Sequence, residues 1–184
     1  MLHIQFTPFP ELTTERLLLR QLTPGDEKEI YDLRTDESVN RYLDRLKARS
    51  IEDARKFIGK INNSISNNEL IIWGICMNDD PALIGSICFW NISKEDNKAE
   101  IGYELLPGWQ GKGLMQEALT KVIEYGFNTI KLHIIEAFAN VENTQSAHLL
   151  EKLNFTRDTL LENKLTGKKE YTNTIIYSLK NKML

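Results

Sequence analysis

Apolar residues form a short strand-like run near the start of the chain and then recur at helical spacing. RLLLR at 16–20 predicts a first strand. Thr23, Pro24 and Asp26 then have the chemistry of a helix start, because Thr can cap, Pro suits the first turn and Asp faces the positive end of the helix dipole. A second helix is predicted from Ser50, where SIED resembles a capping box. The apolar residues at helical spacing after it are Ala54, Phe57, Ile58, Ile61 and Ile65.

The middle of the chain predicts a hairpin, a strand, a helix and a further strand. LIIWGICM (70–77) and LIGSICFW (83–90) are strand-like, and the turn residues NDDP separate them. AEIGYELL (99–106) predicts another strand, and an apolar stripe at helical spacing predicts a helix that runs to about Phe127. LHIIEAF (132–138) has a continuous apolar run, so we expect a central strand that is buried on both faces.

The last part of the chain completes a mixed α/β order of elements. Asn143 can cap a further helix, and TNTIIYSL (172–179) alternates as a last strand. The strand, loop and helix around residue 111 form a right-handed crossover between two strands. Because the chain has 184 residues and no repeat or linker, we expect residues 1–184 to form a single domain.

The composition excludes several classes of protein. The net charge of −3 argues against nonspecific nucleic-acid binding, which needs basic surfaces. No run approaches the about 20 apolar residues of a membrane span, and the N-terminus lacks the features of a signal peptide. We therefore expect a soluble cytoplasmic protein. Cys76 and Cys88 lie in apolar runs and are expected to be buried thiols. The histidines have no metal-ligand spacing, so we expect no metal site.

The stretch PGWQGKGLMQEAL (107–119) joins a predicted strand to a predicted helix. Glycine lets the backbone turn sharply and approach a ligand, and a helix start exposes free N–H groups, so this loop could hold an anion. It lacks the hydroxyl of a P-loop and the third glycine of a dinucleotide fingerprint. Taken alone, the loop is explained equally well as a helix cap whose glycines only permit a turn.

Two longer blocks, AEIGYELLPGWQGKGLMQEAL and IEAFANVENTQSAHLLEKLNF, together with the opening TERLLLRQLTPGD, resemble the GNAT acetyltransferases of the RimJ/RimL type. The resemblance covers about residues 14–180. It implies an α/β (α+β mixed) fold with a mostly antiparallel central sheet of about six to seven strands. About four helices would flank this sheet, and its fourth and fifth strands would splay apart.

The resemblance also implies an activity, the transfer of an acetyl group from acetyl-CoA directly to a primary amine. The expected acceptor is a protein N-terminal α-amine. The alternatives are a small amine of the aminoglycoside or polyamine type, and a non-catalytic CoA-binding module with the same fold. The oligomeric state cannot be predicted from the sequence.

The residues that would bind coenzyme A follow from the family motif Q/R-x-x-G-x-G/A, in which Met115 stands where the family has a small residue. The resemblance implies that backbone amides of the loop hold the pyrophosphate, with added charge from Lys112. These residues are Gln110, Gly111, Lys112, Gly113, Leu114 and Met115. Leu105 and Leu106 would pair with the pantetheine arm as a strand edge. Asn143 would cap its helix and bond the same arm.

Three side chains are assigned to the chemistry by the same resemblance. Glu100 is the first candidate for the base that deprotonates the amine, Glu136 is the second, and Glu104 is a further possibility on the face of Glu100. Each could instead be an ordinary strand glutamate with a structural partner. Ser146 would lie near the thioester sulfur and protonate the leaving thiolate, or it could serve only in capping. Some relatives use a tyrosine one turn later as the acid, and that position is Leu150 here.

The acceptor pocket is expected from about residues 24–68 and 155–175. Four carboxylates give the first of these segments an acidic tendency: Asp32, Asp36, Glu37 and Asp44. A solvated helix face explains these charges equally well. Tyr103, Trp109 and Trp73 could line the cleft, although core packing is the favoured expectation for aromatic residues in this pattern.

Overall fold

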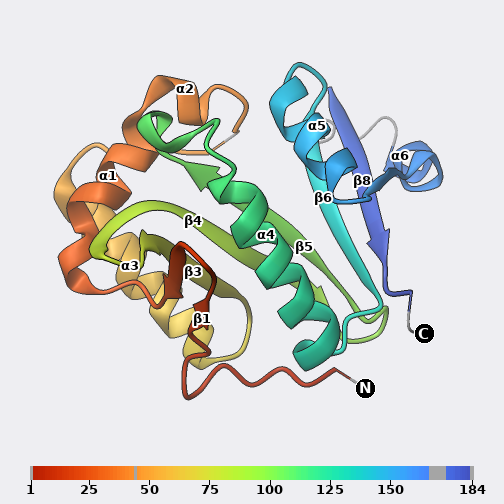
Figure 1. Ribbon diagram of the computed structural model, residues 1–184, viewed down its shortest axis with the longest axis horizontal. Coiled ribbons are helices and arrows are strands. Elements are labelled where there is room, and N and C mark those ends of the chain that lie inside the picture. Colours follow the sequence, from red (N-terminus) through yellow and green to blue (C-terminus); the bar gives the residue numbers. More distant parts are fainter. Residues whose placement is uncertain (1, 44, 166–172, 183–184) are drawn as a thin grey trace.

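A computed structural model describes residues 2–43, 45–165 and 173–182, and its strands form one eight-stranded sheet in the order β1-β2-β3-β4-β5-β6-β8-β7 (Figure 1). The strands are β1 Leu12–Thr13, β2 Leu17–Arg20, β3 Ile71–Met77, β4 Asp80–Ser93, β5 Lys98–Leu105, β6 Ile134–Asn140, β7 Thr156–Arg157 and β8 Thr174–Lys180. The neighbouring strands pair antiparallel, except for β5 and β6, which pair parallel. The predicted mixed α/β fold with a mostly antiparallel sheet is confirmed.

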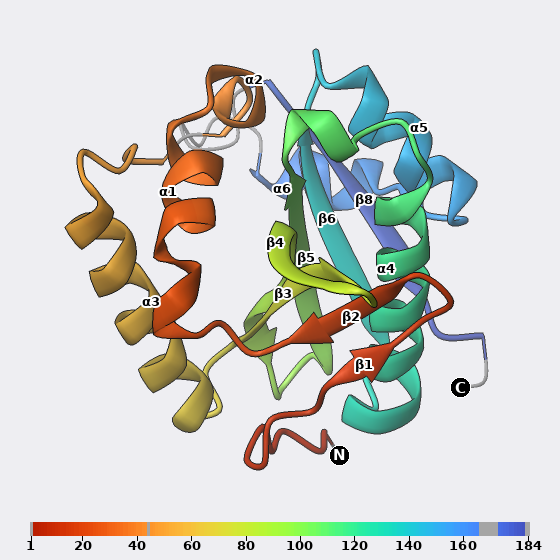
Figure 2. The ribbon, with the colours of Figure 1, turned by 60° about the vertical axis from the view of Figure 1, so that its left-hand side comes forward.

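Helices cover both faces of this sheet. The α-helices are α1 Glu27–Thr35, α2 Glu37–Asn40, α3 Ile51–Ser66, α4 Leu114–Tyr125, α5 Thr144–Lys152 and α6 Thr159–Leu165. Figure 2 shows α1 and α3 on one side of the sheet and α4 on the other. Within the described part of the chain, none of the helices is long and apolar enough to cross a membrane.

Alternating apolar side chains build the core between these layers. Leu17 and Leu19 of β2 are fully buried, and Ala54, Ile58, Ile61 and Ile65 of α3 pack against the other face of the sheet. Trp73 of β3 is also fully buried and meets Phe89 and Tyr125 edge to face. Burying large aromatic and aliphatic side chains in this way is the main source of stability for a sheet covered by helices.

Several predicted boundaries are confirmed by the local chemistry. Ser50 caps α3, since its Oγ accepts a hydrogen bond from Asp53 N at 3.2 Å. The predicted helix start at Thr23 is a 3₁₀ turn, Pro24–Asp26, and α1 follows it from Glu27. The predicted helix to Phe127 ends at Tyr125 and continues as a π-helical turn, Gly126–Ile130.

Other expectations need correction. The prediction of six to seven strands and four helices was low, because β1, β7, α2 and α6 are too short to produce a periodic pattern. Strand β6 is not buried on both faces, since its side chains alternate between buried and half-buried. The predicted last strand begins at Thr174, and Thr172 lies outside the described residues.

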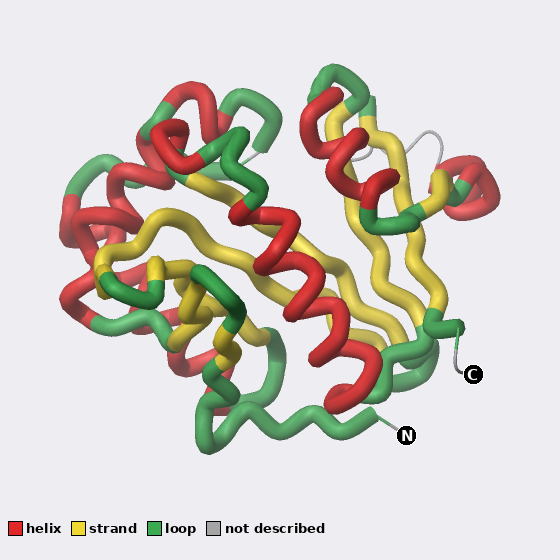
Figure 3. The backbone as a smooth tube through the Cα atoms, in the orientation of Figure 1, coloured by secondary structure: helices red, strands yellow, loops and turns green. Residues whose placement is uncertain are grey.

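The splay between β5 and β6 is the feature of this fold that creates a site. Only three residue pairs join these strands: Lys98–Ile134, Ala99–Ile135 and Glu100–Glu136. Beyond Glu100 the two strands diverge (Figure 3), although β5 continues to Leu105 and β6 to Asn140. The splay expected between the fourth and fifth predicted strands is therefore present between β5 and β6, since β1 shifts the numbering by one. It leaves the later part of β5 without a strand partner on the side of β6.

Candidate active site

A cavity of about 580 Å³ occupies the open end of the splay. Its walls come from four segments: α2 with the loop that follows it, the end of β5, the glycine loop with the first turn of α4, and α5 with its cap Asn143. Residues from positions 38 to 152 therefore meet in one place. A cavity of this size with polar groups on several walls is the default candidate for a binding site.

The glycine loop forms the wall at the start of α4. Gly111 and Gly113 have φ of 73° and 76°, which is the left-handed region that favours glycine. Gly113 is the N-cap of α4, and the N–H of Glu117 donates to its carbonyl at 3.1 Å. The N–H groups of the first helical turn before Glu117 have no intrahelical acceptor. The loop thus has the geometry of an anion site at a helix start.

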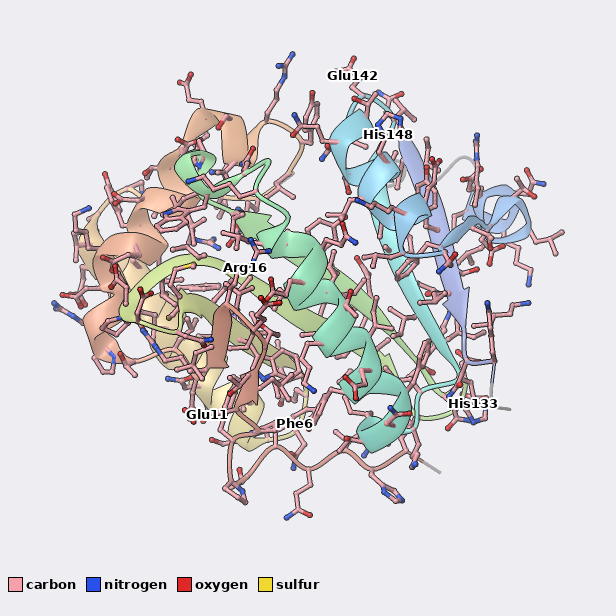
Figure 4. The ribbon with its side chains drawn as sticks, viewed as in Figure 1. Phe6, Glu11, Arg16, His133, Glu142 and His148 are labelled. Carbon is pink, nitrogen blue, oxygen red and sulfur yellow. The ribbon has the colours of Figure 1, made fainter. Side chains whose placement is uncertain are left out.

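An ion pair from Arg16, in the bend just before β2, fixes this loop. Arg16 Nη1 donates to Lys112 O at 3.1 Å, and Arg16 Nε lies 2.7 Å from Glu117 Oε2. Figure 4 shows Arg16 beside the start of α4. Burial opposes ionisation of Glu117, but hydrogen bonds from Thr14 and Arg16 outweigh it and lower the pKa of Glu117. Sequence reasoning missed this tether, because its partners lie about one hundred residues apart.

The other loop residues are divided between solvent and core. Lys112 is exposed, and its Nζ lies 4.9 Å from the centre of the Trp109 ring. Leu114 and Met115 are buried, and the Met115 side chain packs in the hydrophobic core while it also lines the cavity. The large side chain at position 115 is therefore accommodated by the core beneath the loop.

The end of β5 has fewer free backbone hydrogen-bonding groups than the sequence suggests. Leu105 O accepts a hydrogen bond from Gln110 Nε2 at 2.8 Å. Leu106 N donates to Ile84 O at 2.8 Å, and Leu106 O accepts from Trp109 N at 2.9 Å. Both backbone groups of Leu106 are thus engaged within the protein. Of the two residues expected to face a ligand, only Leu105 lines the cavity.

Helix α5 brings two predicted residues to the opposite wall. Asn143 caps α5, as expected, and its Oδ1 accepts from Ser146 N at 3.1 Å. Ser146 Oγ lies 2.8 Å from the hydroxyl of Tyr103 on β5. Asn143, Ser146 and Tyr103 all line the cavity. His148 on α5, which is labelled in Figure 4, lines it as well. The cavity is therefore crossed by a hydrogen bond that no short motif encodes.

Glu100 and Glu136 lie at the closed base of the splay, outside the residues that line the cavity. They are paired positions on neighbouring strands, so their side chains share a face of the sheet. The pKa of Glu100 is raised to about 7, chiefly by burial; the hydrogen bond from Asn91 lowers it, and the negative charge of Glu136 adds to the rise. Glu136 Oε1 lies 3.0 Å from Lys98 Nζ. Glu136 thus has a structural partner, Lys98, as an ordinary strand glutamate would.

Glu104 is the acidic side chain of the cavity wall among the described residues. The ladder between β4 and β5 is regular from Glu100 to Leu105, so Glu104 shares the face of Glu100 and lies opposite to Tyr103. Glu104 Oε2 lies 2.6 Å from Arg45 Nη2, and Glu104 Oε1 accepts from Ser86 Oγ at 3.0 Å. The carboxylate is therefore held by two partners at the edge of the cavity.

The residues expected around the acceptor pocket lie in different places. Tyr103 and Trp109 pack against the core, as favoured, and also line the cavity, whereas Trp73 lies in the core. Asp32 pairs with Lys28 and Asp36 caps α2. Asp44 and residues 166–172 lie outside the described residues. Tyr42 and Leu43, which sequence reasoning did not select, form part of the wall after α2.

No cluster of three or more His, Cys, Asp or Glu side chains that could hold a metal ion is found among residues 2–43, 45–165 and 173–182.

Comparison with known proteins identifies the family. A protein-family model described as an acetyltransferase (GNAT) domain matches residues 16–156. The chain belongs to the GNAT acetyltransferases. It is therefore an acyltransferase of a family that uses acetyl-CoA as the acetyl donor.

Several relatives of this GNAT acetyltransferase are similar over most of their length. An uncharacterized N-acetyltransferase, YoaA of Bacillus subtilis, is 33% identical over 93% of this chain and 97% of its own. The ribosomal protein uS5-alanine N-acetyltransferase of Escherichia coli is 29% identical over 82% of this chain and 80% of its own. The spermidine N(1)-acetyltransferase of Vibrio cholerae is 24% identical over 78% of this chain and 80% of its own.

The solved structures agree on the fold. Mycobacterium smegmatis RimJ in complex with CoA-disulfide superposes with a TM-score of 0.76, over 91% of this chain and 83% of RimJ. Its sequence is 17% identical, so this likeness bears on the fold alone. The uS5-alanine relative agrees with the RimJ/RimL-type branch that the sequence motifs predict.

Proposed function

We propose that this GNAT acetyltransferase moves the acetyl group of acetyl-CoA directly to a primary amine, and that its acceptor is the α-amine of a protein N-terminus. One observation carries the proposal. A single cavity connects the glycine loop at the start of α4 with the Tyr103–Ser146 contact and with the wall after α2. A donor molecule on the loop and an acceptor at the α2 wall could therefore meet beside Ser146.

The residues of the loop fit the diphosphate of coenzyme A. Two left-handed glycines, Gly111 and Gly113, lead into the start of α4, where the first N–H groups lack intrahelical acceptors, and the exposed Lys112 adds positive charge. We assign the diphosphate to the amides of the segment Gln110, Gly111, Lys112, Gly113, Leu114 and Met115. The pantetheine arm is assigned to the Leu105 edge and to Asn143, without Leu106.

When bound, acetyl-CoA supplies an activated thioester, and the protein supplies proton transfer and hydrogen bonds. A free amine is mostly protonated at neutral pH, so it must lose a proton before it can attack. We assign that role to Glu100, acting through water, because a carboxyl with a pKa of about 7 is matched to this task. Glu136 is assigned an electrostatic role, since its charge helps to raise the pKa of Glu100. Ser146 donates a hydrogen bond to the departing sulfur.

The acceptor side rests on the part of the cavity that is lined by Ser38, Tyr42, Leu43 and Glu104. The charge of Glu104 is paired with that of Arg45, so this carboxylate offers hydrogen-bond acceptors rather than net charge. The uS5-alanine relative supports a protein N-terminus as the acceptor. The spermidine relative supports a polyamine as the second candidate.

An acceptor panel tests the proposal. The protein is incubated with acetyl-CoA and with peptides carrying N-terminal alanine or serine, spermidine or an aminoglycoside, and thiol release is followed against a reaction without acceptor. We expect the fastest release with one of the peptides. Fastest thiol release with spermidine would identify a polyamine as the acceptor, which is the second candidate. Binding of coenzyme A without release for any amine, unchanged by Glu100→Gln and Glu136→Gln, indicates a non-catalytic CoA-binding module.

A further inference from the structure

The hydroxyl of Tyr103 and the Oγ of Ser146 lie 2.8 Å apart across the open part of the splay. Tyr103 belongs to β5 and Ser146 to the first turn of α5, so the contact joins the two walls of the cavity. The strand ladder between β5 and β6 holds only three residue pairs, all at the base of the splay, within the described part of the chain. The place where this bond crosses is therefore defined by two side chains.

Ser146 is fixed from a second side as well. Its backbone N–H donates to Asn143 Oδ1 at 3.1 Å, which holds the first turn of α5 in place. A serine hydroxyl has one hydrogen to donate and two lone pairs to accept, and it rotates to suit its partners. The partner on Oγ therefore decides where the single Ser146 hydrogen points.

The direction of the bond follows from the environment of Tyr103. Burial raises the pKa of Tyr103 to about 12, the hydrogen bond with Ser146 acts in the opposite direction, and Tyr177 contributes to the rise. Tyr103 thus stays a neutral phenol throughout the working range of an enzyme. Either hydroxyl has the geometry to donate, and because a phenol is a better donor than an aliphatic alcohol, the favoured direction is from Tyr103 to Ser146, which leaves the Ser146 O–H free for the cavity.

We infer that Tyr103 is a positioning residue for acetyl transfer, which holds Ser146 so that the Ser146 O–H points at the sulfur of the bound thioester. The inference rests on the proposed function. In the step concerned, the amine nitrogen has formed its bond to the acetyl carbon, the C–S bond of the thioester breaks and the sulfur takes the electron pair. Ser146 donates a hydrogen bond to that sulfur, Tyr103 keeps its proton, and water later supplies the proton that completes the thiol. Charge on the sulfur is largest late in the step, so the contribution appears in kcat.

A double-mutant cycle tests the inference. Tyr103→Phe removes one oxygen and is expected to lower kcat about tenfold, with the KM for acetyl-CoA and for the amine within twofold of the wild type. Ser146→Ala is expected to lower kcat at least as much. In the Ser146→Ala background, Tyr103→Phe is expected to have no further effect, since its partner is gone.

Tyr177→Phe is the matched control. Tyr177 lies on β8, its hydroxyl donates to Glu151 at 3.3 Å, and it does not line the cavity, so kcat should not change. An equal loss from Tyr103→Phe in both backgrounds, or no loss in the first, overturns the inference. If Tyr103→Phe does not fold, Ser146→Ala still tests the same bond, and unchanged kcat in that variant also overturns it. An inactive wild type removes the proposed function and this inference together, whereas an active wild type with unaffected variants removes the inference alone.

Discussion

The side-chain amide of Gln110 donates a hydrogen bond to the carbonyl of Leu105 at 2.8 Å. This contact fastens the start of the glycine loop to the end of β5, five residues earlier in the chain. It also engages the backbone acceptor of Leu105, a residue that lines the cavity. Gln110 therefore sets the position of the glycine loop relative to the edge of β5. The loop and this strand edge are the two parts of the proposed coenzyme A site.

Replacing Gln110 by alanine should weaken coenzyme A binding three- to tenfold, because a net hydrogen bond contributes about 1 kcal/mol and the loop loses its anchor. The acetyl-transfer kcat should stay within twofold. Calorimetric titration with coenzyme A measures the affinity, and Gln5→Ala, whose side chain bonds only the nearby Thr7 carbonyl in the exposed N-terminal segment, is the control. Tighter binding by Gln110→Ala would mean that Gln110 competes with the ligand for Leu105.

Gly113→Ala tests whether the left-handed turn is needed. A residue with a Cβ in this conformation costs about 1–2 kcal/mol, so coenzyme A affinity should fall about tenfold or the loop should shift. Gly108→Ala in the same loop is a matched control, since Gly108 is not among the glycines with positive φ and an added Cβ would meet nothing within 4 Å. Equal affinities of the two variants would contradict the assigned loop geometry.

Glu100 should control the pH dependence of catalysis. The pKa of about 7 belongs to a group that must be deprotonated to act as a base, so kcat should rise with pH through about 7 and level off above it. Glu100→Gln should lower kcat and remove this rise. Glu95→Gln, at an exposed position in the turn between β4 and β5, should leave the profile unchanged. A wild-type profile that is flat between pH 6 and 8 would exclude Glu100 as the base.

The same pKa shift makes a prediction about stability. Because the folded-state pKa of Glu100 is raised above the value of an unfolded chain, the folded protein binds the proton more tightly and loses stability as pH rises from about 4.5 to about 7. Glu100→Gln should therefore raise the Tm relative to the wild type at pH 8 more than at pH 5. Thermal unfolding at the two pH values measures this, and an equal difference at both would contradict the burial of the charge.

The ion pair between Arg45 and Glu104 should hold the acceptor wall. Arg45 also donates to Asn40 Oδ1 at 2.7 Å, so it ties the loop after α2 to β5. Arg45→Met leaves a mostly buried carboxylate without its cation and should cost about 1–3 kcal/mol of unfolding free energy. The KM for the amine should rise while the affinity for coenzyme A stays unchanged.

The double variant Arg45→Met/Glu104→Gln should recover most of that stability, because no unpaired charge remains. Lys28→Met, which breaks the exposed pair with Asp32, serves as a control and should change the unfolding free energy by less than about 1 kcal/mol. Denaturant unfolding of the four proteins measures these differences. A double variant that is no more stable than Arg45→Met would show that lost packing, and not the charge, explains the effect.

Local chemistry in the sequence was sufficient for much of the fold. Ser50 and Asn143 cap helices because a cap depends on residues within one turn. Gly111 and Gly113 mark a turn because few other residues tolerate positive φ. The two-residue strands β1 and β7 were missed, since two residues carry no periodicity.

The candidate site was less predictable, because its decisive contacts join residues far apart in the chain. Tyr103 meets Ser146 across 43 positions, and Arg45 meets Glu104 across 59. The motif resemblance pointed to Ser146 but could not reveal the hydroxyl that reaches it from β5. The position one turn after Ser146 on α5, Leu150, is buried and apolar, and the second hydroxyl comes instead from Tyr103 on strand β5. Burial also decides the pKa of Glu100, and burial depends on the assembled sheet.

The most direct test of the central claim is a crystal structure of the protein with coenzyme A bound. The account predicts the diphosphate oxygens about 3 Å from backbone nitrogens in the segment from Gly111 to Met115, with the pantetheine arm lying in the splay beside Leu105. A diphosphate bound elsewhere on the molecule, or a loop whose amides remain turned away from it, would contradict the account.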